Sequence, residues 1–78
     1  MKISNDFDLD VYSLVANNIN KHLKLKGISI LELSNYAEID SEYLQLFLSG
    51  KKDEIISIYD LYKISKVLNI SMEQFFLK

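Results

Sequence analysis

Apolar residues recur along this chain at the spacing of an α-helix, and the alternation typical of a β-strand is absent. Four of them, each four residues from the next, form the first stripe: Val11, Val15, Ile19 and Leu23. We expect the helix that carries this stripe to begin between Asp6 and Asp10, where each Asp can serve as a cap, and to run to Lys26. Gly27 then offers the left-handed conformation that ends many helices.

Two short helices are predicted in the middle of the chain. Ser29 and Glu32 have the spacing of a capping box, so the first helix should cover about residues 30–37. Asp40 is a good N-cap residue, so the second helix should cover about residues 41–49. Because so few residues separate them, the two helices must cross steeply.

The last quarter of the chain predicts two more helices. Ser57 can cap the first of them, whose inner stripe consists of four apolar residues: Ile58, Leu61, Ile64 and Leu68. Asn69 suits the left-handed position at its end. Ser71 and Gln74 have the spacing of a second capping box, which would open a short fifth helix through Phe76.

Five helices in 78 residues predict a single, compact all-α domain, with residues 1–10 as an N-terminal extension. The apolar positions predict its core: Val15, Ile19, Leu33, Leu44, Phe47, Ile58, Leu61, Leu68 and Phe76. A chain this short buries only about 60% of the surface that it exposes when unfolded, so self-association would add useful stability.

Composition narrows the classes of function. No apolar run approaches the ~20 residues of a membrane span. The polar, acidic start MKISNDFDLD is unlike a signal peptide, so we expect a cytoplasmic protein with no membrane partner. The absence of Cys excludes disulfides and Cys-based zinc sites. His22 has no second His to complete a site, so we expect no metal, no cofactor and no enzymatic activity.

Charge is unevenly distributed along the chain. Residues 28–50 contain no basic residue and four acidic ones: Glu32, Glu38, Asp40 and Glu42. Lysines flank this acidic segment on both sides: Lys21, Lys24 and Lys26 before it, and Lys51 and Lys52 after it. All nine basic residues are Lys, so Arg, the usual bidentate reader of guanine, is not available.

Four stretches match the pattern of a known family of DNA-binding domains. They are Gly27-Ile-Ser after the first helix, LELSNYAEI, DSEYLQLFLSGKK, and SIYDLYKISKVLNISMEQFF. On these, from about Ile19 to Phe76, the chain resembles the lambda-repressor-like helix-turn-helix family, the Cro/C1 or XRE-type regulators. The resemblance implies a compact five-helix domain that binds double-stranded DNA as a bacterial or phage transcriptional regulator. It also implies a homodimer that acts on a palindromic site.

The resemblance places the second short helix in the major groove, with its loop and the flanking lysines on phosphates. The candidate DNA contacts are Ser41, Glu42, Gln45, Ser49, Lys51, Lys52 and Lys26. Gln can pair with adenine, Glu can accept from cytosine, and Ser can do either. The simpler interpretation of these side chains is a solvated helix face and surface lysines.

The chain departs from the family pattern at several positions. Family members often have Gln at Ile30 and Gly at Glu38, and the positions of Leu46 and Leu48 are usually polar. Ile30, Leu46 and Leu48 therefore predict an exposed apolar and acidic face. That face supports an alternative function, a degenerate helix-turn-helix that binds another protein as an antirepressor or as a regulator's partner.

Aromatic and apolar residues near the C-terminus are candidates for a dimer surface, because aromatic residues are enriched at interfaces. The candidates are Tyr59, Tyr62, Phe75 and Leu77.

Overall fold

The computed structural model describes residues 3–50 and 55–78, and the side chains from Val11 onward within these ranges. This part of the chain is all-helical, with no strand. Its elements in chain order are α1 (Ile3–Lys26), α2 (Ile30–Ala37), α3 (Ser41–Leu48), α4 (Ile58–Leu68) and a 3₁₀ helix, η1 (Met72–Phe76). The expected fifth α-helix is therefore a 3₁₀ turn.

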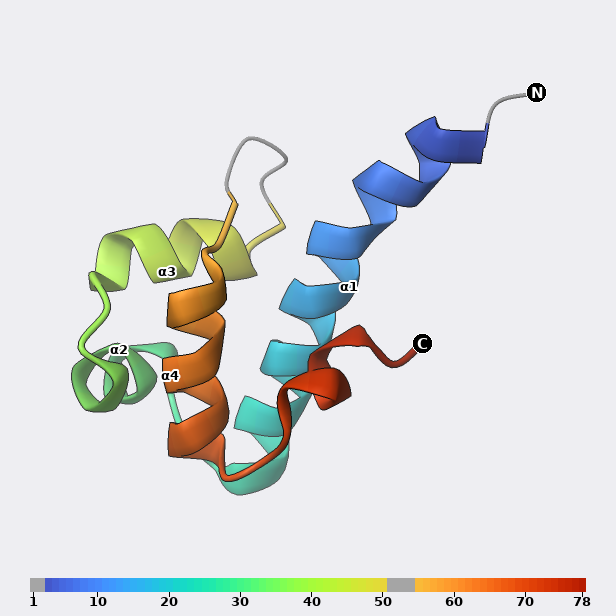
Figure 1. Ribbon diagram of the computed structural model, residues 1–78. Coiled ribbons are helices and arrows are strands. Elements are labelled where there is room, and N and C mark those ends of the chain that lie inside the picture. The colour runs from blue at the N-terminus through green and yellow to red at the C-terminus, as the bar shows by residue number, and fades with distance from the viewer. Residues whose placement is uncertain (1–2, 51–54) are drawn as a thin grey trace.

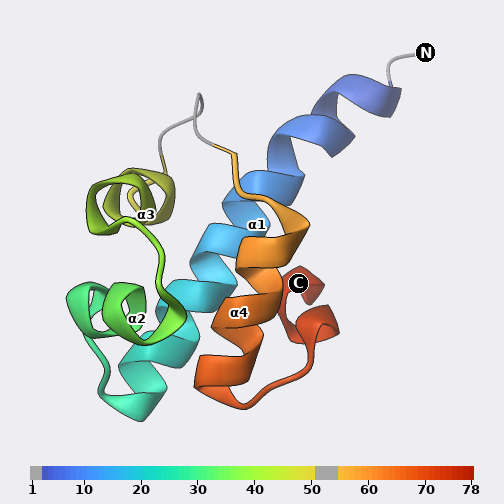
Figure 2. The ribbon, with the colours of Figure 1, turned by 60° about the vertical axis from the view of Figure 1, so that its left-hand side comes forward.

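The long helix α1 runs through the whole molecule, and the other elements pack around its second half (Figures 1 and 2). The α2–α3 pair lies on one side of α4, and η1 lies against α1. The first turns of α1 extend beyond the other elements (Figures 1 and 2). This projection gives the molecule an elongated outline of 43 × 23 × 21 Å.

The core forms where α1, α2, α3, α4 and η1 meet. Seven of the nine predicted core residues are buried: Val15, Ile19, Leu33, Leu44, Phe47, Leu61 and Leu68. The prediction is wrong for Ile58, which is 70% exposed, and for Phe76, which is 43% exposed. Ile56, in the segment before α4, and Phe75 are buried in their place.

The geometry of the elements explains both errors. Ile58 is the first residue of α4, where the helix has only begun to approach the core. In η1 the turn contains three residues and not 3.6, so the residue that faces inward shifts from Phe76 to Phe75.

Most of the predicted helix ends are confirmed. Ser29 and Glu32 make the reciprocal capping box, and Asp40 and Ser57 accept bonds from the backbone N–H three residues on. Gly27 has φ +68°, as its role at the end of α1 requires. Asn69 has φ 57°, as expected at the end of α4.

Two predicted helix boundaries and one predicted cap are wrong. α1 begins at Ile3, before the Asp6–Asp10 stretch, so the expected extension is largely helical. α3 ends at Leu48, one residue early. Ser71 makes no side-chain cap, because its carbonyl accepts a bond from the N–H of Gln74 at 3.1 Å, the i to i+3 pattern of a 3₁₀ helix.

A buried amide attaches the C-terminal segment to α1. The side chain of Asn18 donates two hydrogen bonds of 2.8 Å, to the carbonyls of Phe75 and Leu77. Asn18 is 9% exposed, and its bond to Phe75 is buried while its bond to Leu77 is partly buried. This role of Asn18 was not predicted from the sequence, although an Asn in the middle of a helix can indicate a polar contact.

Candidate nucleic-acid interface on α2 and α3

A three-residue turn joins α2 to α3. Glu38 adopts the left-handed conformation with φ 57° and ψ 49°, and Ile39 is buried beneath the turn. The N–H of Ile39 donates to the carbonyl of Ser34 at 3.0 Å, which closes the end of α2. Asp40 then starts α3 by accepting a bond from the N–H of Tyr43 at 2.9 Å. The sequence therefore sets both ends of this turn locally.

A small side chain lies on the buried face of α2. Ser34 is 3% exposed, and its hydroxyl donates to the carbonyl of Leu31 at 2.7 Å. The buried hydroxyl therefore has a hydrogen-bond partner within its own helix, so its burial leaves no donor unpaired. Its small volume leaves room for a neighbouring element to pack closely against α2.

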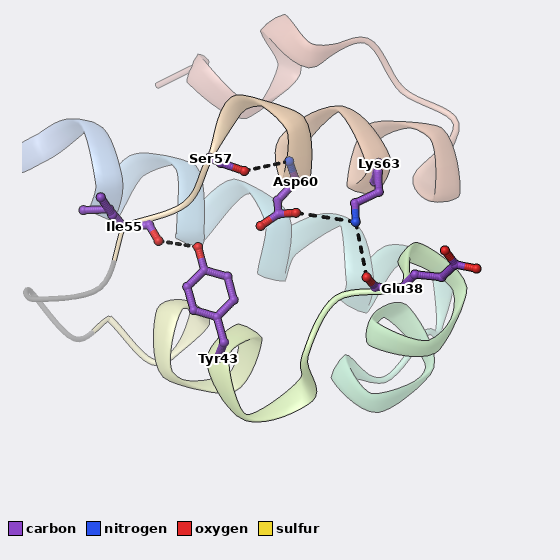
Figure 3. Close-up of polar contacts among 6 residues, drawn as sticks. All are labelled: Glu38, Tyr43, Ile55, Ser57, Asp60 and Lys63. Carbon is purple, nitrogen blue, oxygen red and sulfur yellow. Dashed lines mark hydrogen bonds and ion pairs between the residues drawn. The ribbon is translucent and has the colours of Figure 1, made fainter.

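Contacts from α4 hold the turn in place (Figure 3). The ammonium of Lys63 donates to the carbonyl of Glu38 at 3.2 Å and lies 3.6 Å from the carboxylate of Asp60. The N–H of Asp60 donates in turn to the hydroxyl of Ser57 at 3.0 Å. A single lysine thus connects the turn to the capped first turn of α4.

Two further hydrogen bonds fix the position of α3. The phenol of Tyr43 donates to the carbonyl of Ile55, so the first turn of α3 is bound to the segment before α4 (Figure 3). At the other end, the amide of Asn20 donates to the carbonyl of Leu48 at 2.9 Å, which satisfies a free carbonyl of the last turn. The sequence pattern did not predict the role of Asn20.

The outward face of α3 contains most of the expected DNA-reading residues. Glu42, Gln45 and Ser49 are exposed, and Ser41 is half-buried. The hydroxyl of Ser49 donates to the carbonyl of Leu46 at 2.7 Å, which fixes the Ser49 side chain at the C-terminal end of α3. The residues of this face can accept or donate hydrogen bonds, but none of them is a cation.

The apolar part of the expected face is smaller than predicted. Leu46 is 38% exposed and lies on the outer side of α3, as expected. The expectation is wrong for Leu48, which is 6% exposed, because the last turn of α3 packs against α1 and Leu48 points into the core. Ile30 is half-buried against the core. On α2, Leu31 and Tyr36 are exposed instead.

The carboxylates of α2, the turn and α3 all face solvent. They are Glu32, Glu38, Asp40 and Glu42. Lys26 is exposed at the end of α1, next to the start of α2, as are Lys21 and Lys24 before it. Lys51 and Lys52 lie outside the described residues, so their expected place beside α3 stays a prediction.

The candidate dimer residues divide into two groups. Tyr59, Tyr62 and Leu77 are exposed, by 67%, 47% and 54%. Phe75 is fully buried in the core and is not available to a partner, which corrects that expectation. On α4 the ammonium of Lys63 lies 4.8 Å from the ring centre of Tyr59, and that of Lys66 lies 5.5 Å from the ring centre of Tyr62.

Among the described side chains, those of residues 11–50 and 55–78, no three His, Cys, Asp or Glu come together as metal ligands. No helix within residues 3–50 and 55–78 has the length and apolar character that a membrane crossing requires. Comparison with protein-family models, with curated proteins and with solved structures finds no match for this chain.

Proposed function

We propose that this chain is a lambda-repressor-like helix-turn-helix protein, a bacterial or phage transcriptional regulator that binds double-stranded DNA as a homodimer. The observation that supports the proposal is the α2–turn–α3 unit. Its turn is short and left-handed at Glu38, its two ends are capped, and α4 and α1 both hold it in place. Among the described residues, Glu42, Gln45 and Ser49 on the outer face of α3 are exposed.

In this mechanism α3 enters the major groove. Gln45 pairs with an adenine, Glu42 accepts from the amino group of a cytosine, and Ser41 contacts a base edge near the start of the helix. Ser49, Lys26, Lys51 and Lys52 contact phosphates on either side. A second copy reads the other half of a palindromic site.

The test begins with selection of binding sites from a random pool of duplex DNA. Gln45→Ala should then relax the preference at one base pair, by about 1–3 kcal/mol of discrimination, because a bidentate contact is lost. Gln74→Ala is the matched control, since Gln74 lies in η1 and not on α3. A wild-type protein that selects no sequence would contradict the proposal.

The exposed carboxylates favour a second candidate function. With Glu32, Glu38, Asp40 and Glu42 all facing solvent, the α2–α3 face offers negative charge where phosphates would have to approach. Such a face suits a basic protein surface, and above all the DNA-reading surface of another regulator.

One substitution separates the two candidates. Leu46→Lys places a cation on the exposed face of α3, where the side chain is 38% exposed and the fold should tolerate it. If the partner is a basic protein, the complex should be lost. If the partner is DNA, the non-specific affinity should rise, because the new cation faces phosphate.

A further inference from the structure

An open apolar groove lies at the side of the molecule formed by the middle of α1, the start of α4 and η1. Its volume is about 530 Å³. The lining includes Val11, Tyr12 and Val15 of α1, Ile56 and Ile58 around the start of α4, and Phe76 of η1. None of the described residues that line it carries a charge. Exposed apolar surfaces of this kind mark interaction sites.

The two failures of the core prediction both fall in this groove. The sequence pattern marks Ile58 and Phe76 as core residues, yet they are 70% and 43% exposed in a single copy. Tyr12, which lines the same groove, is 41% exposed. Large apolar side chains that a single copy leaves open to water make this surface suitable for contact with a second molecule.

The first turns of α1 lie next to this groove in the chain. The first turns of α1 project past every other element (Figures 1 and 2), directly before the groove residues Val11 and Tyr12. At 1.5 Å per residue, the eight residues 3–10 extend for about 12 Å. In proteins, most of the stability of a helix comes from tertiary packing of its apolar face. Its sequence, ISNDFDLD, includes three apolar residues.

We propose that the groove binds the projecting start of α1 from a second copy of this chain. The two features adjoin on α1, so a two-fold axis near Val11 and Tyr12 brings each helix start to the other copy's groove. Such a contact is reciprocal and closed, and it belongs to the helix-in-groove mode of recognition. A stable interface buries at least about 1,200 Å² in total, which favours two such contacts over one.

The inference rests on the self-association in the proposed function, and it does not depend on DNA binding. The experiment measures the molar mass of the full-length protein in solution, without DNA, over a range of concentrations. The wild-type protein should form a dimer. Ile58→Lys should give a monomer with unchanged helical circular dichroism, because Ile58 is 70% exposed in the single copy. Leu31→Lys, at a 57% exposed position on α2 outside the groove, should remain a dimer.

A mixing experiment tests the reciprocal geometry. Phe7→Lys alters the projecting segment and should also give a monomer. A mixture of Ile58→Lys and Phe7→Lys should recover a dimer weaker than the wild type, because the Phe7→Lys copy keeps its groove and the Ile58→Lys copy keeps its helix start. A contact between any other surfaces would not be restored by mixing.

The possible failures are distinct. A wild-type protein that stays monomeric would overturn both this inference and the proposed homodimer. A dimer that survives Ile58→Lys, or a mixture that stays monomeric, would overturn the inference alone. A dimer with the expected responses that binds no DNA would support the inference and count against DNA recognition.

Discussion

At the scale of single residues, α3 shows how neighbouring leucines come to differ. Leu44 is fully buried, Leu46 is 38% exposed, and Leu48 is 6% exposed. Helical spacing alone places Leu44 inward and Leu46 outward. Leu48 is buried because the last turn of α3 contacts α1, where the side chain of Asn20 also donates to the carbonyl of Leu48.

Leu44→Ala should lower the free energy of unfolding by about 2–5 kcal/mol, because it removes a fully buried side chain and leaves a cavity. Leu46→Ala is the matched control and should cost much less, because part of that side chain already faces water. Denaturant unfolding followed by circular dichroism measures both. A loss well under 1 kcal/mol for Leu44→Ala would show that the core at α3 is not packed as described.

Asn18→Ala should lower the stability by about 1–3 kcal/mol, since it removes both hydrogen bonds to the C-terminal segment and leaves the buried carbonyl of Phe75 without its donor. Asn17→Ala, one residue earlier at an exposed position, should change the stability by no more than about 0.5 kcal/mol. The same unfolding measurement applies. Equal effects of the two substitutions would refute the special role of Asn18.

At the scale of elements, local capping residues explain most of the helix boundaries, but the left-handed residue within the turn between α2 and α3 also needs tertiary support. Glu38 holds a left-handed conformation that costs a residue other than Gly roughly 1–2 kcal/mol. The bond from Lys63 to its carbonyl and the burial of Ile39 keep the turn in this form. Tertiary contacts therefore maintain a locally unfavourable conformation.

Glu38→Gly should raise the stability by about 1 kcal/mol, because Gly adopts the left-handed region without strain and the carbonyl that binds Lys63 is retained. Asn69→Gly, at the other left-handed residue with φ 57°, should gain less, because Asn tolerates this region better than Glu. Thermal unfolding of the two variants compares them directly. Destabilisation by Glu38→Gly would mean that its side chain contributes more than its backbone conformation costs.

At the scale of the whole molecule, negative and positive charges lie in different places: the α2–α3 face is acidic, and lysines flank it in the sequence. The carboxylates gather on the face that would read DNA, and the basic residues before it lie at the end of α1. The proposed DNA binding would then depend strongly on cations at the edges of the site. The salt dependence of binding is the measurement that reports on them.

Replacement of both Lys51 and Lys52 by Ala should weaken binding to all DNA sequences alike and reduce the salt slope by about 2, because two phosphate contacts are lost. The control replaces Lys66 and Lys78, which carry the same charge but have no assigned phosphate contact. Gel shifts at several salt concentrations give both slopes. An unchanged slope in the first variant would remove these two lysines from the site.

The sequence by itself determined the local features of this protein. Helical periodicity, Ser29, Asp40 and Ser57 as caps, and Gly27 and Asn69 as helix ends follow from interactions within a few residues, so they can be inferred without the fold. The resemblance to helix-turn-helix regulators placed the candidate readers on the outer face of α3. The expected readers Glu42, Gln45 and Ser49 are indeed exposed there.

Only the tertiary structure decided what depends on distant parts of the chain. Leu48 is buried because α1 meets the end of α3, and Asn18 and Asn20 bind carbonyls 57 and 28 residues away. Phe75 and not Phe76 is buried because the last turn is a 3₁₀ helix packed on α1. Periodicity describes which side of a helix is apolar, but burial also requires that another element cover that side.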